Sequence, residues 1–135
     1  MSSELFDQGL AVRRAVVGNE YVDRAMSTAD DFNRDFQELV TKYCWGEIWG
    51  RPGLSRPTRS MLNIAMLSAL NRPQELELHL RGALRNGVTA DEIREVLLQV
   101  AIYCGVPAGV EGFRIARKVL AEAATETPPA EDSGD

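Results

Sequence analysis

The stretch HLRGALRNGVTADEIREVLLQVAIYC, residues 79–104, shows most clearly what kind of fold this chain adopts. Residues 91–104 carry apolar side chains on one face, at the spacing of three to four residues that is typical of an amphipathic helix. Thr89 with Glu92 three residues later forms a capping box, and Asn86-Gly87 is a typical stop for a preceding helix. The stretch therefore predicts two helices joined by a short turn.

The remaining chain continues this pattern and has no convincing segment of alternating apolar and polar residues, the mark of a half-buried strand. Residues 57–70 are apolar almost all round from Met61 onward, which places this helix at the centre of the fold or between subunits. Pro107 is suited to the first turn of a last helix. We therefore predict an all-α fold of about six helices. They are expected at 4–17, 31–43, 57–70, around His79, at 91–104 and from Pro107 onward.

Length and charge limit the class of protein. With 135 residues, of which 44% are hydrophobic, the chain has material for one core, and we expect a single domain over residues 1–122. Five acidic residues and no basic residue lie from Glu122 onward, so residues 123–135 are expected to form a disordered acidic tail. The preceding chain balances 15 acidic against 15 basic residues, which does not favour a nucleic-acid partner.

Membrane and disulfide-rich classes are also disfavoured. No run approaches the ~18 apolar residues of a membrane span, and residues 1–10 are too polar for a signal peptide. We therefore expect a cytoplasmic protein. Cys44 and Cys104 lack a CxxC partner and metal-ligand spacing, so they are expected to be free thiols.

His79 is the only histidine and the first candidate for chemistry. Helical spacing places it on the face of Leu76 and Leu80, with Glu75 one turn earlier. One interpretation is a histidine that borders the core and makes one hydrogen bond. The other is a residue that gives or takes a proton near neutral pH. A lone histidine cannot form a typical catalytic zinc site, so no metal is expected.

The segment KYCWGEIWGRPGL, residues 42–54, holds both tryptophans and a carboxylate between glycines. Packing of Glu47 against Trp45 and Trp49 would remove the carboxylate from water and favour its protonated form. Equally, the indoles could pack a helix end or a subunit contact and leave Glu47 exposed. Both alternatives are compatible with the sequence.

Arginines are frequent around both candidate segments. Residues 51–60 contain three of them, and Arg72 and Arg81 flank His79. Most are expected on a solvated face or in salt bridges. Two or three could converge on an anionic substrate, because the planar guanidinium matches a carboxylate.

These residues resemble a known family. The resemblance is carried by VTKYCWGEIWGRPGL (residues 40–54) and by TRSMLNIAMLSALNRPQELELHLRGALRNGVTADEIREVLLQVAIYCGVPAGVEGFR (residues 58–114). Both resemble the carboxymuconolactone decarboxylase family, within the alkylhydroperoxidase-like superfamily, and the similarity runs from about residue 5 to residue 120. The spacing H-x-x-x-A-x-x-x-G-V-T-x-x-E-I from His79 is shared with the superfamily, whereas the first segment distinguishes the family.

The resemblance implies an alkylhydroperoxidase-like helical bundle that forms a homo-oligomer, a hexamer or alternatively a trimer. It also implies a cofactor-independent reaction on a dicarboxylate lactone: 4-carboxymuconolactone loses carbon dioxide and gives β-ketoadipate enol-lactone in protocatechuate breakdown. Redox members of the superfamily carry a CxxC before the histidine, where this chain has Arg72 and Glu75. Their peroxidase activity is therefore not implied.

The implied reaction gives each candidate residue a role. His79 is expected to protonate the intermediate, with Glu47 orienting it or serving as the acid itself. Tyr103, or a backbone N–H near Gly105, is expected to stabilise charge on the lactone oxygen. Substrate binding is expected from Arg51, Arg72, Arg81, Trp45 and Trp49.

Two other functions stay open on the sequence. One is a thiol-dependent redox or peroxidase-like member of the superfamily that uses Cys44 or Cys104. The other is a non-catalytic oligomeric binding protein that has the fold without the chemistry. A related carboxylated lactone as the substrate is also compatible with the sequence.

Overall fold

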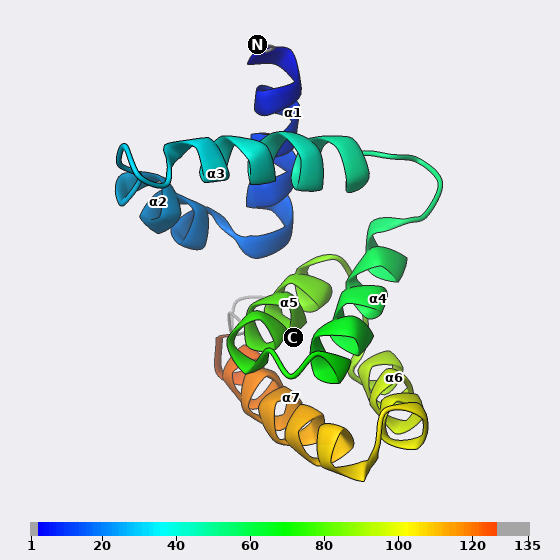
Figure 1. The fold of residues 1–135 in the computed structure, drawn as a ribbon. Coiled ribbons are helices and arrows are strands. Elements are labelled where there is room, and N and C mark those ends of the chain that lie inside the picture. The colour runs from blue at the N-terminus through cyan, green and yellow to red at the C-terminus, as the bar shows by residue number, and fades with distance from the viewer. Residues whose placement is uncertain (1–2, 127–135) are drawn as a thin grey trace, which may run out of the picture.

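The computed structural model describes residues 3–126, and every regular element in this range is helical (Figure 1). No strand occurs in the described range, which confirms the all-α fold predicted from the sequence. The helices are α1 (Ser3–Val17), α2 (Asn19–Ser27), α3 (Arg34–Leu39), η1 (Val40–Ile48), α4 (Arg56–Ala69), α5 (Pro73–Arg85), α6 (Ala90–Tyr103) and α7 (Val106–Glu126).

The helices form two groups, joined by residues 49–55 (Figure 1). The first group contains α1, α2 and the continuous α3–η1 rod, and the second contains α4 to α7. Each group has its own apolar core. The first includes Val12, Val16, Val22, Trp45 and Trp49, and the second includes Ile64, Leu76, Leu80, Leu97 and Ile115. Helix α5 links them, because Leu78 packs against the first core and Arg85 Nη1 donates to the carbonyl oxygen of Val16 at 3.1 Å.

The backbones of α1 and η1 cross at very short range because both helices have glycine at the crossing. A Cβ added to Gly9 would collide with the carbonyl oxygen of Thr41, and one added to Gly46 would lie 3.0 Å from that of Leu5. Arg13 also ties the two helices, since its Nη1 donates to Thr41 Oγ1 at 3.1 Å. This crossing determines where η1, and with it both tryptophans, lies.

Several helix ends follow the signals in the sequence. Thr89 and Glu92 form the predicted capping box of α6: Glu92 N donates to Thr89 Oγ1 at 3.1 Å, and Thr89 N donates to Glu92 Oε1 at 3.0 Å. Helix α5 ends at Arg85, and Gly87 follows with a φ of 94°, in the left-handed region that glycine adopts easily. The stop predicted from Asn86-Gly87 is therefore confirmed.

Three parts of the fold differ from the prediction. Helix α2 is not predicted, because only Val22 of its nine residues is buried and the apolar period is too short to recognise. Residues 40–48 form a π-helix rather than leading into a loop, a geometry too rare to be expected from apolar spacing. Helix α7 continues to Glu126, past the predicted boundary at residue 122, through the alanine-rich segment AEAATE, which favours helix. The rest of the predicted tail, residues 127–135, lies outside the described residues.

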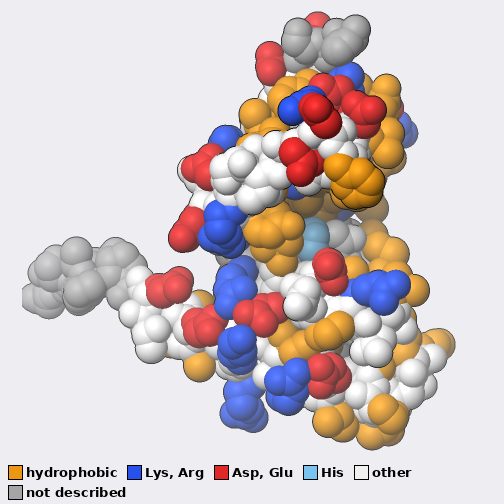
Figure 2. Space-filling model, turned by 60° about the vertical axis from the view of Figure 1, so that its left-hand side comes forward, with side chains coloured by type: hydrophobic (Ala, Val, Ile, Leu, Met, Phe, Trp, Pro, Cys, Tyr) orange, Lys and Arg blue, Asp and Glu red, His pale blue; other side chains and the backbone are white. Residues whose placement is uncertain are grey.

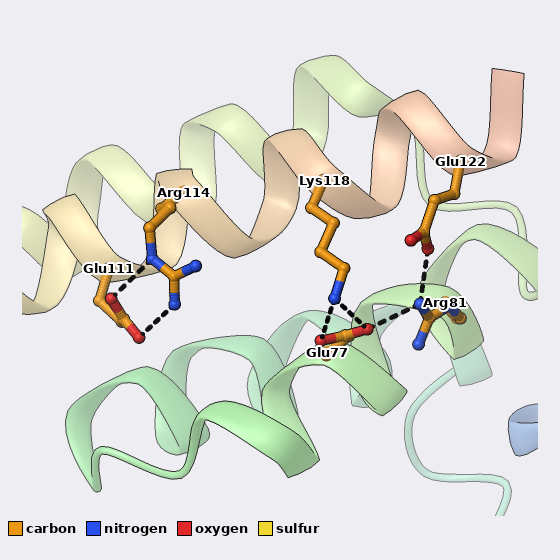
Figure 3. A network of polar contacts seen from close by, with 6 residues as sticks. All are labelled: Glu77, Arg81, Glu111, Arg114, Lys118 and Glu122. Atoms are coloured by element: carbon orange, nitrogen blue, oxygen red, sulfur yellow. Dashed lines mark hydrogen bonds and ion pairs between the residues drawn. The ribbon is translucent and has the colours of Figure 1, made fainter.

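Ion pairs join α5 to α7 on the outside of the bundle (Figure 3). Arg81 Nη2 lies 2.7 Å from a carboxylate oxygen of Glu77 and 2.6 Å from one of Glu122, and Lys118 Nζ lies 3.2 Å from Glu77. The hydrogen bond from Arg81 lowers the pKa of Glu77. Residues two apart point to opposite sides of a helix, so Arg81 lies on the face of α5 away from His79.

We expect Gly9→Ala to lower the free energy of unfolding by about 3 kcal/mol, because α1 and η1 must separate to admit the new methyl group. Gly53→Ala is the matched control, since a Cβ at Gly53 meets no heavy atom within 4 Å. Urea unfolding at one protein concentration, followed by tryptophan fluorescence, measures both. Equal unfolding midpoints for the two variants would contradict the close crossing.

Candidate functional site

His79 lies where the two helical groups meet, stacked against both tryptophans. Its ring centroid is 6.0 Å from that of Trp45, with the planes 5° apart, and 6.4 Å from that of Trp49, with the planes 26° apart. The two indole centroids are 5.1 Å apart. Both indoles are buried and His79 is half-buried. Figure 2 shows the pale-blue histidine in the hollow between the upper and lower helices. These three residues are called the aromatic cluster below.

Helix η1 presents both indoles to the same side. Its π-helical geometry pairs each backbone N–H with the carbonyl five residues earlier, as when Trp49 N donates to the carbonyl oxygen of Cys44 at 3.0 Å. Trp45 and Trp49 are four residues apart and therefore lie about one turn apart on one face. Segments of π-helix are found frequently at functional sites.

Asn63 of α4 contacts the imidazole from a third element. Its Nδ2 lies 3.3 Å from Nδ1 of His79, and this contact is partly buried. The sequence prediction did not include Asn63 in the site. The available signal was its position as a lone amide in the otherwise apolar stretch MLNIAML, where a buried polar side chain needs a partner.

The surroundings of His79 disfavour its charged form. Burial lowers the pKa of His79 from its ordinary value of 6.5 to about 4, and the field of Glu75 opposes this shift only in part. The imidazole is therefore neutral at physiological pH. A neutral imidazole has one nitrogen that donates a hydrogen bond and one that accepts.

Two arginines belong to the segments next to the aromatic cluster, Arg51 after η1 and Arg59 on α4. Arg59 is one turn before Asn63 on α4 and so lies on the same face. Its Nη2 donates to the carbonyl oxygen of Arg51 at 3.4 Å, and its Nε is buried with no hydrogen-bond partner among residues 3–126. Arg51 is exposed and follows Trp49 by two residues. The fold thus brings the side chain of Arg59 to the backbone of Arg51, on the segment that follows Trp49.

Comparison with known proteins identifies the family. Residues 34–118 match the model of the carboxymuconolactone decarboxylase family. The chain belongs to this family. A 4-carboxymuconolactone decarboxylase of Acinetobacter baylyi is 45% identical over 115 residues, which cover 85% of this chain and 86% of the relative. A nitrosuccinic acid decarboxylase of Metarhizium robertsii is 46% identical over 116 residues, which cover 86% of this chain and 81% of the relative.

In this member of the carboxymuconolactone decarboxylase family the tryptophans shield His79 rather than Glu47. Glu47 is exposed on η1, whereas Trp45 and Trp49 are 5% and 6% exposed and turn toward α5. Of the two alternatives for Glu47, the carboxylate desolvated by the indoles is therefore wrong for the single chain. The fold uses the opposite side of η1 for the aromatic packing.

Three other predicted site residues lie away from the aromatic cluster. Tyr103, at the end of α6, is 82% exposed and lines a groove with Met61 of α4. Met61 is two residues from Asn63 and so lies on the opposite face of α4. Arg72 precedes α5 by one residue and is seven residues, or about 10 Å along the helix axis, from His79. Arg81 is paired on the far face of α5, so its predicted role in substrate binding is not supported.

The described residues add three further facts about the site. Cys44 and Cys104 are both free and exposed. Residues 3–126 contain no group of three or more histidine, cysteine, aspartate or glutamate side chains that could hold a metal ion. In the same range no helix combines the length and apolar character needed to cross a membrane.

We expect His79 to make the protein less stable as the pH falls. Because its pKa is about 4 in the fold and 6.5 ordinarily, the unfolded chain binds more protons between these values. The contribution of neutral His79 to the free energy of unfolding is complete above pH 6.5 and falls by up to about 3 kcal/mol as the pH approaches 4. Urea unfolding of the wild type and of His79→Gln at pH 7.0 and 4.5 measures it. The same pH dependence in both proteins would contradict the shift.

Proposed function

We propose that this protein decarboxylates 4-carboxymuconolactone to β-ketoadipate enol-lactone, in the cytoplasmic breakdown of protocatechuate. The observation that carries the proposal is the 45% identity, over 85% of the chain, to the 4-carboxymuconolactone decarboxylase of A. baylyi. The aromatic cluster, with Arg51 and Arg59 on the adjoining segments, supports it as a site for an anionic substrate with an unsaturated ring.

The proposed reaction needs suitable surroundings rather than a cofactor. The departing carboxylate is on the carbon γ to an unsaturated lactone carbonyl. When its bond to that carbon breaks, carbon dioxide leaves and the electron pair moves through the double bond onto the carbonyl oxygen. The resulting dienolate takes one proton on the carbon next to the carbonyl. The substrate is therefore its own electron sink.

The aromatic cluster favours this step by excluding water. In the substrate the negative charge is concentrated on the carboxylate, whereas in the transition state it spreads into the ring. Surroundings with little water therefore destabilise the substrate more than the transition state. Trp45 and Trp49 provide such surroundings, and His79 is the polar group among them that contacts the lactone in this proposal.

Arg51 is proposed to hold the second carboxylate of the substrate, the acetate that does not leave, and Arg59 to assist it. The side chain of Arg59 reaches the backbone carbonyl of Arg51, and the buried Nε of Arg59 has no partner in the described residues. Binding this spectator group tightly, and the departing group weakly, directs binding energy to the transition state. A guanidinium group also suits the planar geometry of a carboxylate.

We expect Arg51→Ala to raise KM about 10- to 100-fold, the loss typical of a hydrogen bond between charged groups. Arg51→Lys should recover little of this, because an ammonium group cannot bind a carboxylate in the bidentate manner. Arg81→Ala is the matched control, since Arg81 is paired with Glu77 and Glu122 on the far side of α5. KM is measured by steady-state kinetics. An equal rise of KM in Arg51→Ala and Arg81→Ala would reject the role of Arg51 in substrate binding.

We further propose that the protein is a homo-oligomer, a hexamer or alternatively a trimer. The corner between α6 and α7 supports an assembly, because large apolar side chains are exposed there. They are Ile102 (79% exposed), Tyr103 (82%), Val106 (65%) and Val110 (63%). The roles predicted for Tyr103, Arg72 and Glu47 then belong to a site completed by a neighbouring copy. Light scattering of the purified protein measures the assembly, and a monomer at micromolar concentration would reject it.

A second candidate substrate is nitrosuccinate, favoured by the 46% identity to the M. robertsii enzyme. Loss of the carboxylate next to the nitro group leaves a nitronate, so this substrate is also a small dicarboxylate that carries its own electron sink. Its demands on the site are the same: water excluded from one carboxylate, a cation for the other, and a hydrogen-bond donor for the oxygen that gains charge.

The deciding experiment compares the two substrates and tests the thiol alternative. Freshly prepared 4-carboxymuconolactone and nitrosuccinate are incubated separately with the enzyme, and carbon dioxide release is followed. We expect turnover of the lactone at the higher kcat/KM, and unchanged turnover in the Cys44→Ser, Cys104→Ser double variant. Activity lost with the cysteines would support the thiol-dependent alternative. Ligand binding without decarboxylation of either substrate would support the non-catalytic one.

A further inference from the structure

The contact between Asn63 and His79 bears on which ring nitrogen carries the hydrogen of the neutral imidazole. The amide nitrogen of Asn63 has hydrogens to donate and no lone pair to accept with, and it faces Nδ1 of His79 at 3.3 Å. With the amide nitrogen toward the ring, as here, Nδ1 is the acceptor in this contact. In a neutral imidazole the single hydrogen is in that case on Nε2.

The groups that surround the imidazole also favour its neutral form. Its contacts from η1 are the rings of Trp45 and Trp49, and its contact from α4 is the amide of Asn63, all of them uncharged. On its own helix, Glu75 is the charged group whose field favours protonation. Desolvation outweighs that field and lowers the pKa of His79 to about 4.

We propose that Asn63 is a positioning residue that holds His79 as the neutral Nε2–H tautomer, so that His79 donates a hydrogen bond to the substrate oxygen that gains charge. The inference rests on the proposed decarboxylation and deepens it. It replaces the sequence-based expectation that His79 protonates the intermediate carbon, because an imidazolium is scarce in this site at neutral pH. The same donor serves a dienolate oxygen or a nitronate oxygen.

The steps of the reaction balance with this assignment. The bond between the ring carbon and the carboxylate breaks, carbon dioxide departs, and the electron pair comes to rest on the carbonyl oxygen. The hydrogen on Nε2 of His79 bonds to that oxygen and stays on His79 throughout. After carbon dioxide has left, a water molecule from the solvent gives a proton to the carbon next to the carbonyl. The hydroxide that remains combines with the released carbon dioxide to give bicarbonate.

The tautomer can be observed directly, because His79 is the only histidine in the chain. Long-range ¹⁵N–¹H correlation spectra of the imidazole, recorded without substrate on protein with its affinity tag removed, distinguish the two tautomers and the imidazolium. We expect the Nε2–H tautomer alone from pH 6 to pH 8. A protonated Nδ1 in this range, in either the neutral or the charged ring, would overturn the inference.

The Asn63→Asp variant tests whether the contact controls catalysis. A carboxylate accepts a hydrogen bond, so it should draw the hydrogen of the neutral ring to Nδ1 and leave Nε2 without a hydrogen to donate. We expect kcat to fall about 10²- to 10³-fold, as for loss of one donor to a developing oxyanion, with KM little changed. Gln99→Glu makes the same amide-to-acid change at an exposed site on α6 and should leave both the tautomer and kcat as in the wild type.

The pH profile separates failure of this inference from failure of the proposed function. With His79 as a neutral donor, kcat should show no ionisation of His79 between pH 6 and pH 8. A wild-type profile with an ionisation near pH 6.5 that disappears in His79→Gln would overturn the inference while the decarboxylase stands. Absence of turnover on both substrates, together with the Nε2–H tautomer, would instead reject the proposed function.

Discussion

The stacking of His79 on Trp45 and Trp49 is the interaction on which the rest of this structure depends. The indoles belong to η1 and the imidazole to α5, so one ring stack joins two helical groups that have separate cores. The ring stack requires η1 to lie close to α1, and the glycines where α1 and η1 cross permit this close approach. The same packing removes the imidazole from water, so the contact that closes the fold also sets the chemistry of its histidine.

Charged side chains are distributed unevenly between the outside of the bundle and the aromatic cluster. Carboxylates and guanidinium groups pair on the outside of the bundle, as Arg81 does with Glu77 and Arg114 with Glu111 (Figure 3). The groups in contact with the ring of His79 are instead two indoles and one amide. A reaction that spreads a concentrated negative charge gains from such a site, because each hydrogen bond donated there is stronger than it would be in water. In the proposed reaction Arg51, on the segment after Trp49, holds the part of the substrate that does not react.

The sequence identified residues of the site better than it identified which of them contact one another. His79, Trp45 and Trp49 are brought together, yet the indoles cover the histidine and leave Glu47 exposed. The choice depends on which side of η1 faces α1 and α5, and a π-helix does not follow the apolar spacing used to predict faces. Asn63 was missed for a related reason: one amide in an apolar helix does not reveal its partner sixteen residues away.

The sequence by itself determined the all-α class, the ends of α5 and α6 and the family, because helix periodicity, capping residues and the two family segments are local features of the chain. Only the tertiary structure decided which polar groups meet. The side chain of Arg59 reaches the backbone of Arg51, whereas Arg81 is paired with Glu122 of α7. Such pairings depend on the crossing of α1 with η1 and on the packing of α4 against α5, which join residues distant in the chain.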